Sequence, residues 1–221
     1  MSFSVTPHDY MDFIKRAAAR IKEDREYITA LDAATGDGDH WANINLGFEQ
    51  LLKAEAELRE MNMGAMFKKI GMIMMSKIGG SSGILYGGAY QAAGRSIGDK
   101  PAISGEELAL ALETMAGDMM RRGQAQPGFK TMIDALYPAA ETFKQCLADG
   151  VNDITTLNRV KEAAKAGAEA TRDMEAVKGR ATYQANKGVG HLDPGAVTMA
   201  YQVECLCDTL LDKLQKDQEG A

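Results

Sequence analysis

Apolar residues recur at intervals of three and four positions along most of the chain, which is the spacing of one face of an amphipathic helix. The first run begins after Thr6 and Pro7, an N-cap residue followed by a first-turn proline. Its apolar positions are Ile14, Ala18, Ile21, Ile28 and Leu31. The pattern therefore predicts a first helix from about 7 to 31.

The same spacing predicts seven more helices, and no run of alternating β-branched residues predicts a strand. Ser104 and Glu107 form a capping box at one helix start, and Asn152 or Asp153 caps another. The predicted helices run from His40 to about Asn62, across 61–78, from Gly83 to Ile97, from Ser104 to about Arg122, from about Lys130 through Phe143, from Asn152 to about Val177, and from Val197 through Leu214. We expect the polar tail from Gln215 to be frayed.

Eight helices with mostly short connections predict an all-α fold, an antiparallel up-and-down arrangement in a single domain that covers 1–221. In that arrangement, every connection from an odd helix to the next even one lies at the same end. These four connections are the glycine-rich ones, at 32–40, 79–83, 123–130 and 178–195. One end of the molecule is therefore expected to carry the chemistry.

The first of these connections is strongly acidic. Asp32, Asp37 and Asp39 lie within eight positions, and Gly36 and Gly38 allow the backbone to fold back until the carboxylates converge. Carboxylate oxygens suit Mg²⁺ or Ca²⁺, and the stretch lacks the twelve-residue calcium loop, which favours Mg²⁺. Aspartates are also common turn and N-cap residues, so the loop alone leaves both interpretations open.

The other connections supply groups that bind phosphate. Ser81 and Ser82 follow Gly80 just before a predicted helix, whose N-terminal N–H groups favour anions. Lys130 with Thr131 and also Arg180 add donors, and His40 and His191 are candidates for phosphate orientation or acid–base work. Each of these residues alone is commonly a turn, capping or solvated residue. Together they predict a site for a magnesium–nucleotide polyphosphate.

Charge narrows the possible partners and the metal count. The net charge of −6 and the pI near 5.2 argue against nucleic acid as a partner. Three carboxylates with a diphosphate would place a charge of about −6 in one pocket, so we predict two Mg²⁺ ions. The three cysteines make no disulfide or zinc framework, and we find no secretory signal or membrane span, so we expect a cytoplasmic protein.

Taken together, these segments resemble one known family, the nucleotide-binding L subunits of dihydroxyacetone kinases. The segments that carry the resemblance are Leu31 to His40 with Asn43, Gly79 to Gly83, Arg122 to Met132 with Asp134, Lys178 to Tyr183, and Gly190 to Ala196. They occur in the family's order along the whole chain.

The resemblance implies an eight-helix barrel that carries ADP or ATP at one end, with Asp32, Asp37 and Asp39 as magnesium ligands. It implies His40 and Arg180 as catalytic residues. The residues expected at the nucleotide are His40, Asn43, Ser81, Ser82, Gly123, Thr131, Met132, Arg180, Asp193, Pro194 and Gly195.

The resemblance also implies partners. In the phosphotransferase-system version, ADP stays bound, accepts a phosphoryl group from a phosphohistidine of an M subunit, and passes it to a small ketose held by a K subunit. Nothing in the chain resembles a K domain, so we expect one subunit of a kinase, with a homodimer as a further expectation.

Two positions depart from the family pattern: Trp41 replaces a usual glycine, and Ile84 replaces a frequent proline. They leave two alternatives open. One is the catalytic subunit of an ATP-dependent ketose or tetrose kinase with exchangeable ATP, and the other is a non-catalytic protein that senses nucleotide.

Overall fold

The computed structural model describes residues 3–219, and this part of the chain is mainly helical. Its α-helices are α1 (Pro7–Glu23), α2 (Arg25–Thr35), α3 (His40–Lys53), α4 (Glu55–Arg59), α5 (Met63–Lys77), α6 (Gly80–Ile97), α7 (Gly105–Gly123), α8 (Ile133–Ala148), α9 (Asp153–Ala170) and α10 (Pro194–Glu219). Two short 3₁₀ helices, η1 (Thr171–Asp173) and η2 (Arg180–Tyr183), lie between α9 and α10. The all-α prediction is confirmed.

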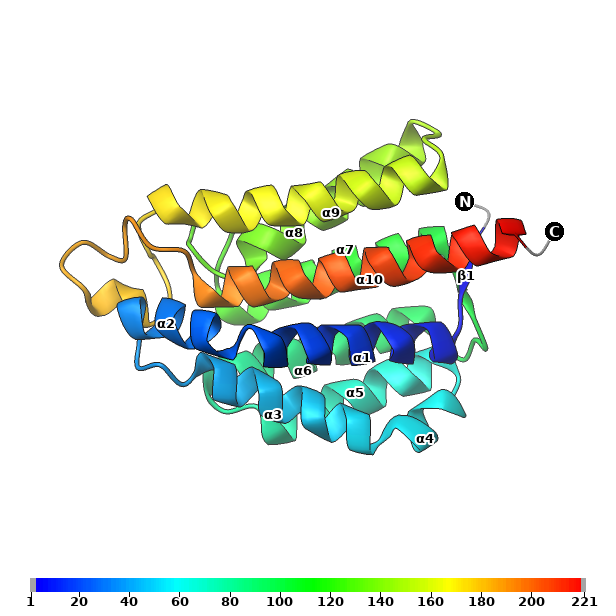
Figure 1. Ribbon diagram of the computed structural model, residues 1–221, viewed down its shortest axis with the longest axis horizontal. Helices are drawn as coiled ribbons and strands as arrows, with labels where there is room; N and C mark the ends of the chain where they lie inside the picture. The colour runs from blue at the N-terminus through cyan, green and yellow to red at the C-terminus, as the bar shows by residue number, and fades with distance from the viewer. Residues whose placement is uncertain (1–2, 220–221) are drawn as a thin grey trace.

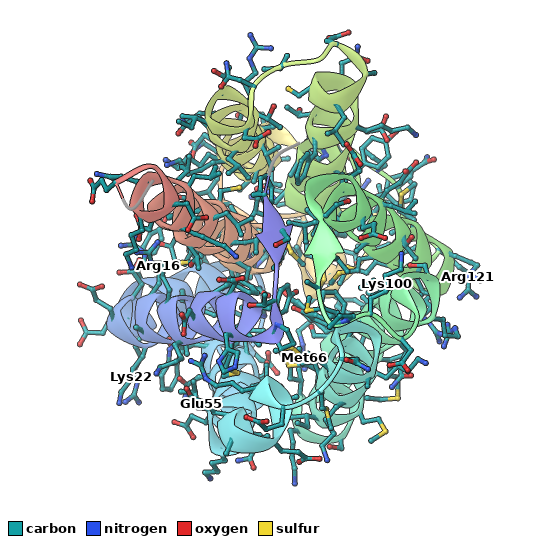
Figure 2. The ribbon with its side chains drawn as sticks, turned by 90° about the vertical axis from the view of Figure 1, so that its right-hand side faces the viewer. Arg16, Lys22, Glu55, Met66, Lys100 and Arg121 are labelled. Atoms are coloured by element: carbon teal, nitrogen blue, oxygen red, sulfur yellow. The ribbon has the colours of Figure 1, made fainter. Side chains whose placement is uncertain are left out.

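The long helices form a closed ring. Going around it, α1 contacts α3, α3 contacts α5, and each helix from α5 to α9 contacts the next helix along the chain. The ring closes because α10 packs against α1, and Figure 2 shows the ring from one end. The eight predicted helices correspond to these helices. The first predicted helix consists of α1 and α2, and the second consists of α3 and α4. The up-and-down barrel is confirmed.

The interior of the barrel is apolar, with aromatic rings at the end farther from the glycine-rich connections. The centre of the Phe67 ring of α5 lies 4.6 Å from the centre of the Tyr10 ring of α1 and 5.4 Å from that of the Tyr90 ring of α6. The hydroxyl groups of Tyr10 and Tyr90 are 3.0 Å apart, which satisfies both in a dry environment. These contacts join three helices of the ring.

A strand pair that the sequence did not predict lies across the same end. The strand β1 (Ser4–Val5) pairs antiparallel with β2 (Ile103–Ser104), with Val5 opposite Ile103. Figure 2 shows the pair near the middle of the ring. Strands of two residues are too short to show an alternating pattern.

Helix starts follow the predicted capping residues. Thr6 and Asp9 form a capping box at α1, Ser104 and Glu107 form another at α7, and Asn152 caps α9. Among residues 3–219, no helix combines the length and the apolar character needed to span a membrane.

Five predicted boundaries were wrong. The first helix breaks at Asp24 and resumes as α2, which runs to Thr35. The second is interrupted at Ala54, between α3 and α4. The segment 79–83 is mostly helical, because α6 begins at Gly80. The seventh helix ends at Ala170, before the predicted Val177. The tail from Gln215 stays helical through Glu219, and residues 220–221 lie outside the described part.

Candidate functional site

The four glycine-rich connections meet at one end of the barrel, on the left in Figure 1. Hydrogen bonds join them in pairs. Gln184 Nε2 in the last connection donates to the carbonyl oxygen of Ala34 over 2.7 Å, and Val177 N donates to the carbonyl oxygen of Phe129 over 3.2 Å. The site therefore consists of segments far apart in sequence that hold one another.

Three carboxylates converge in the first connection. Asp32 lies in the last turn of α2 and is buried, whereas Asp37 and Asp39 are exposed. One oxygen from each lies within 4.8 Å of the others. The backbone N–H of His40 donates to Asp32 Oδ2 over 2.9 Å, which ties the start of α3 to the end of α2.

The geometry of this cluster fits a hard divalent cation. Three negative groups at this spacing repel one another unless a cation lies among them. One basic side chain, Arg180 of η2, approaches the cluster, with its Nη2 atom 2.7 Å from Asp37 Oδ2. The Arg180 and Asp37 side chains are 60% and 40% exposed, so water screens this ion pair and a metal or a phosphate can replace either partner at little cost.

His40 is held by a hydroxyl group of α10. Its Nε2 atom lies 2.9 Å from Thr198 Oγ1, and the Thr198 hydroxyl itself donates to the carbonyl oxygen of Pro194 or Gly195. Because that hydroxyl proton is used, we assign Thr198 Oγ1 as the acceptor of a hydrogen bond from His40 Nε2–H, which makes Nδ1 the unprotonated nitrogen. Burial lowers the pKa of His40 below 6.5, against the opposing charges of Asp32 and Asp39. His40 is therefore neutral near pH 7.

The N-terminus of α6 forms a second part of the site. Ser81 is exposed and Ser82 is partly buried in its first turn, where the N–H groups lack partners within the helix. Asn43 of α3 accepts a hydrogen bond from Gly79 N over 3.3 Å, which places it beside this turn. A Cβ atom added at Gly123 would lie 3.5 Å from Leu85, so the end of α7 adjoins α6.

The third connection forms a turn organised by Asp134. Its carboxylate accepts the N–H groups of Gly128 and Thr131 over 2.5 and 2.7 Å. Met132 follows and lies against the start of α10, since a Cβ atom added at Gly195 would be 3.7 Å from Met132 Cβ. Thr131 and Met132 thus lie beside the last connection.

Lys130 differs from its predicted role. It neither opens a helix nor faces solvent, because it is 2% exposed and its Nζ donates to the carbonyl oxygens of Thr171 and His191. Burial lowers its pKa, with Asp193 and Asp134 opposing the change. Lys130 therefore fastens both ends of the connection that carries Arg180. His191 itself is exposed and contributes its carbonyl group to this contact.

Asp193 opens α10, followed by Pro194 and Gly195. Its Oδ2 atom accepts the N–H of Ala196 over 2.7 Å, as an N-cap residue does, and its own N–H donates to Thr171 Oγ1 over 3.0 Å. Burial, together with the nearby charges of Asp134 and Asp32, raises the pKa of Asp193 to about 7, against the lowering effects of the Ala196 N–H and Lys130. The carboxyl group thus titrates near neutral pH.

The sequence did not single out Thr198, Thr171 or Gln184. Thr198 had a usable signal, because it lies four residues after Pro194 and hence on the same face of the last helix. Thr171 lies in the 3₁₀ helix η1 and Gln184 in the irregular segment after η2, and the apolar spacing did not indicate the direction of either side chain.

Comparison with known proteins adds a family match. The family model described as the DAK2 domain matches residues 34–208. The chain is 31% identical over 206 residues to the PEP-dependent dihydroxyacetone kinase, ADP-binding subunit DhaL of Escherichia coli K12, covering 93% of this chain and 97% of that protein. It is 35% identical over 200 residues to the ADP-binding subunit DhaL of PEP-dependent dihydroxyacetone kinase 2 of Listeria innocua, covering 90% of each.

A solved structure agrees with these matches. The dihydroxyacetone kinase of C. freundii in complex with AMP-PNP and Mg²⁺ aligns with a TM-score of 0.68 at 28% identity. The alignment covers 90% of this chain and 33% of that one, so this chain spans about a third of the C. freundii kinase chain.

Proposed function

The chain belongs to the DAK2 domain family, which includes ADP-binding subunits of dihydroxyacetone kinases, and from that premise we propose that it is such a subunit. It takes a phosphoryl group from a phosphohistidine of an M-type subunit of the phosphotransferase system. Bound ADP carries the group to a small ketose on a K-type subunit. This protein is thus the phosphotransferase component of a kinase whose substrate lies on a separate chain.

The observation that carries the proposal is the meeting of three carboxylates with the N-terminus of α6. Asp32, Asp37 and Asp39 converge to within 4.8 Å, and Asn43 connects α3 to the turn that opens α6. Carboxylates hold cations, and a helix N-terminus holds phosphate. A magnesium–nucleotide complex requires both in one place.

We assign Asp32, Asp37 and Asp39 to two Mg²⁺ ions. Three carboxylates with the diphosphate of ADP bring about six negative charges together, and Arg180 offsets only one of them. When bound, Mg²⁺ supplies the positive charge that phosphoryl transfer requires.

The remaining site residues are assigned to the nucleotide. Ser81 and Ser82 offer hydroxyl and N–H donors from the first turn of α6, and Asn43 lies next to them. Further residues near the ends of α7, α8 and α10 are expected to contact the part of ADP beyond the phosphates. They are Gly123, Thr131, Met132, Asp193, Pro194 and Gly195.

Two residues are assigned to the transfer itself. Arg180 pairs with Asp37 and stands on a half-exposed turn, from which its guanidinium group can contact the transferred phosphoryl group. Neutral His40, oriented by Thr198, presents Nδ1 as an acceptor beside the acidic cluster. We expect the subunit to work in the cytoplasm, and a homodimer remains an expectation.

The test uses the purified protein, a K-type partner with dihydroxyacetone, and a phosphorylated M-type donor. We expect ADP to be released on acid denaturation, and we expect the Asp37→Ala variant to lose nearly all transfer. Asp217→Asn, an exposed carboxylate near the other end of α10, serves as the matched control and should keep full transfer.

Three results would contradict the proposal. Absence of adenine nucleotide from the Mg²⁺-loaded protein would exclude a retained cofactor. Transfer supported by ATP alone with the K-type partner would indicate an ATP-dependent ketose or tetrose kinase. Transfer that survives Asp37→Ala would indicate a nucleotide-sensing protein.

A further inference from the structure

Trp41, the only tryptophan of the chain, joins the acidic cluster to the break between α1 and α2. It stands in the first turn of α3, and its indole Nε1 donates to the carbonyl oxygen of Ile21 over 2.9 Å. The guanidinium carbon of Arg25 lies 4.5 Å from the centre of the ring system. Trp41 therefore contacts the last turn of α1 and the first residue of α2.

The indole N–H supplies a hydrogen-bond donor to a carbonyl group that the end of α1 leaves without a partner in the helix. The last four carbonyl groups of a helix lack partners within it, and Ile21 is one of these in α1. The stacked Arg25 adds a cation–π contact on the other side of the break. The break is thus held by a side chain of a third helix.

Such support matters because α2 is poorly anchored on its own. It has eleven residues, and only Ile28, Asp32 and Thr35 are buried. A helix of this length is marginal without tertiary contacts. Its orientation therefore depends on what holds its two ends.

Two adjacent residues of α3 hold those two ends. Trp41 contacts the start of α2, and the N–H of His40 bonds to Asp32 in its last turn over 2.9 Å. A second fastening comes from α10, where the Tyr201 hydroxyl donates to Asp24 Oδ2 over 2.6 Å. Asp32 therefore meets Asp37 and Asp39 only when α2 keeps the angle that these contacts set.

We propose that Trp41 is a positioning residue of the metal site, which fixes the angle of α2 and so holds Asp32 in place for Mg²⁺. This inference rests on the proposed magnesium–ADP function.

The test measures ADP binding by calorimetry across a range of Mg²⁺ concentrations. Trp41→Phe keeps the ring over Arg25 but loses the N–H, and Trp41→Gly loses both contacts. We expect the dissociation constant of ADP in Mg²⁺ to rise about tenfold in the second variant, as for other groups that orient metal ligands, and by a smaller factor in the first. The Mg²⁺ concentration at half-saturation should rise in the same order.

Two control variants separate positioning from general stability. Tyr27→Ala removes a 46% exposed aromatic side chain from α2 itself and should leave binding unchanged. Leu58→Ala removes a fully buried side chain of α4, far from the site in Figure 1, and should lower Tm while leaving the Mg²⁺ dependence unchanged.

The outcomes distinguish the two proposals. Tight magnesium-dependent binding of ADP by the unaltered protein and equally by Trp41→Gly would overturn the role of Trp41 and leave the proposed function intact. A change in Trp41→Phe that Leu58→Ala reproduces would also overturn it. Absence of magnesium-dependent binding in the unaltered protein would overturn both.

Discussion

Gly36 faces the carboxylate of Asp32 so closely that a Cβ atom at position 36 would lie 2.6 Å from Asp32 Oδ1. A Cβ atom and a carboxylate oxygen do not approach this closely without one of them moving. The backbone N–H of Gly36 also donates to the carbonyl oxygen of Asp32 over 2.5 Å. The absence of a side chain at Gly36 is therefore what leaves room for the buried metal-ligand candidate.

Gly36→Ala is expected to weaken ADP binding in Mg²⁺ by about tenfold, because the new methyl group displaces the Asp32 carboxylate. Calorimetric titration with ADP in Mg²⁺ measures the change. Gly117→Ala is the matched control, since a Cβ atom there meets nothing within 4 Å in the middle of α7. Equal affinity in the two variants would show that Asp32 does not need this space.

Lys130→Met is expected to loosen the connection between α9 and α10. Methionine fills a similar volume but cannot donate to the carbonyl groups of Thr171 and His191, and each such bond from a charged group contributes about 1.5 to 3 kcal/mol. Chymotrypsin should then cut faster after Tyr183, which is 90% exposed on this connection. Lys144→Met, at an exposed lysine of α8, should leave the rate of cleavage unchanged.

Asp193→Asn is expected to flatten the dependence of stability on pH. The pKa of Asp193 in the folded protein, about 7, lies above its ordinary value of 3.8, so the folded state holds the proton more tightly. The protonated Asp193 carboxyl group therefore adds to the free energy of unfolding. This contribution is complete below about pH 3.8 and is lost as pH rises through about 7.

The measurement compares Tm of the two proteins at pH 5 and pH 8. The unaltered protein should lose roughly 5 °C more than Asp193→Asn, in which the amide oxygen still caps Ala196. Parallel curves for the two proteins would show that Asp193 does not titrate in this range.

Thr198→Val is expected to release the imidazole of His40 from its fixed tautomer, because valine offers no acceptor to Nε2. Transfer should fall by about tenfold or more, and the ¹⁵N shifts of the ring should show that both neutral tautomers are populated. Thr198→Ser keeps the hydroxyl group and should behave as the unaltered protein. Unchanged ring shifts in Thr198→Val would contradict this orientation of His40.

Much of the architecture followed from helical spacing and capping residues. Thr6, Ser104 and Asn152 mark real helix starts. The up-and-down order of the eight predicted helices also places the four glycine-rich connections at one end. The convergence of Asp32, Asp37 and Asp39 could also be predicted, since two glycines separate close carboxylates.

Other features depend on tertiary contacts and left no local signal. The break at Asp24 interrupts apolar spacing that continues from Ile21 to Ile28, and partners from α3 and α10 hold it open. The burial of Lys130 depends on carbonyl groups 41 and 61 residues away in sequence. Spacing along the chain cannot encode either contact.

Because α1 and α10 close the ring side by side, the two ends of the described chain are neighbours at the end opposite the acidic cluster (Figure 1). Lys213 Nζ of α10 bonds to the Ser4 carbonyl oxygen over 2.8 Å, which ties these ends together. A short peptide could therefore join them, and the chain could be reopened at 98–102 as a circular permutant with the acidic cluster left intact. The barrel can likewise be appended to another domain through either end without obstructing the face on which its chemistry takes place.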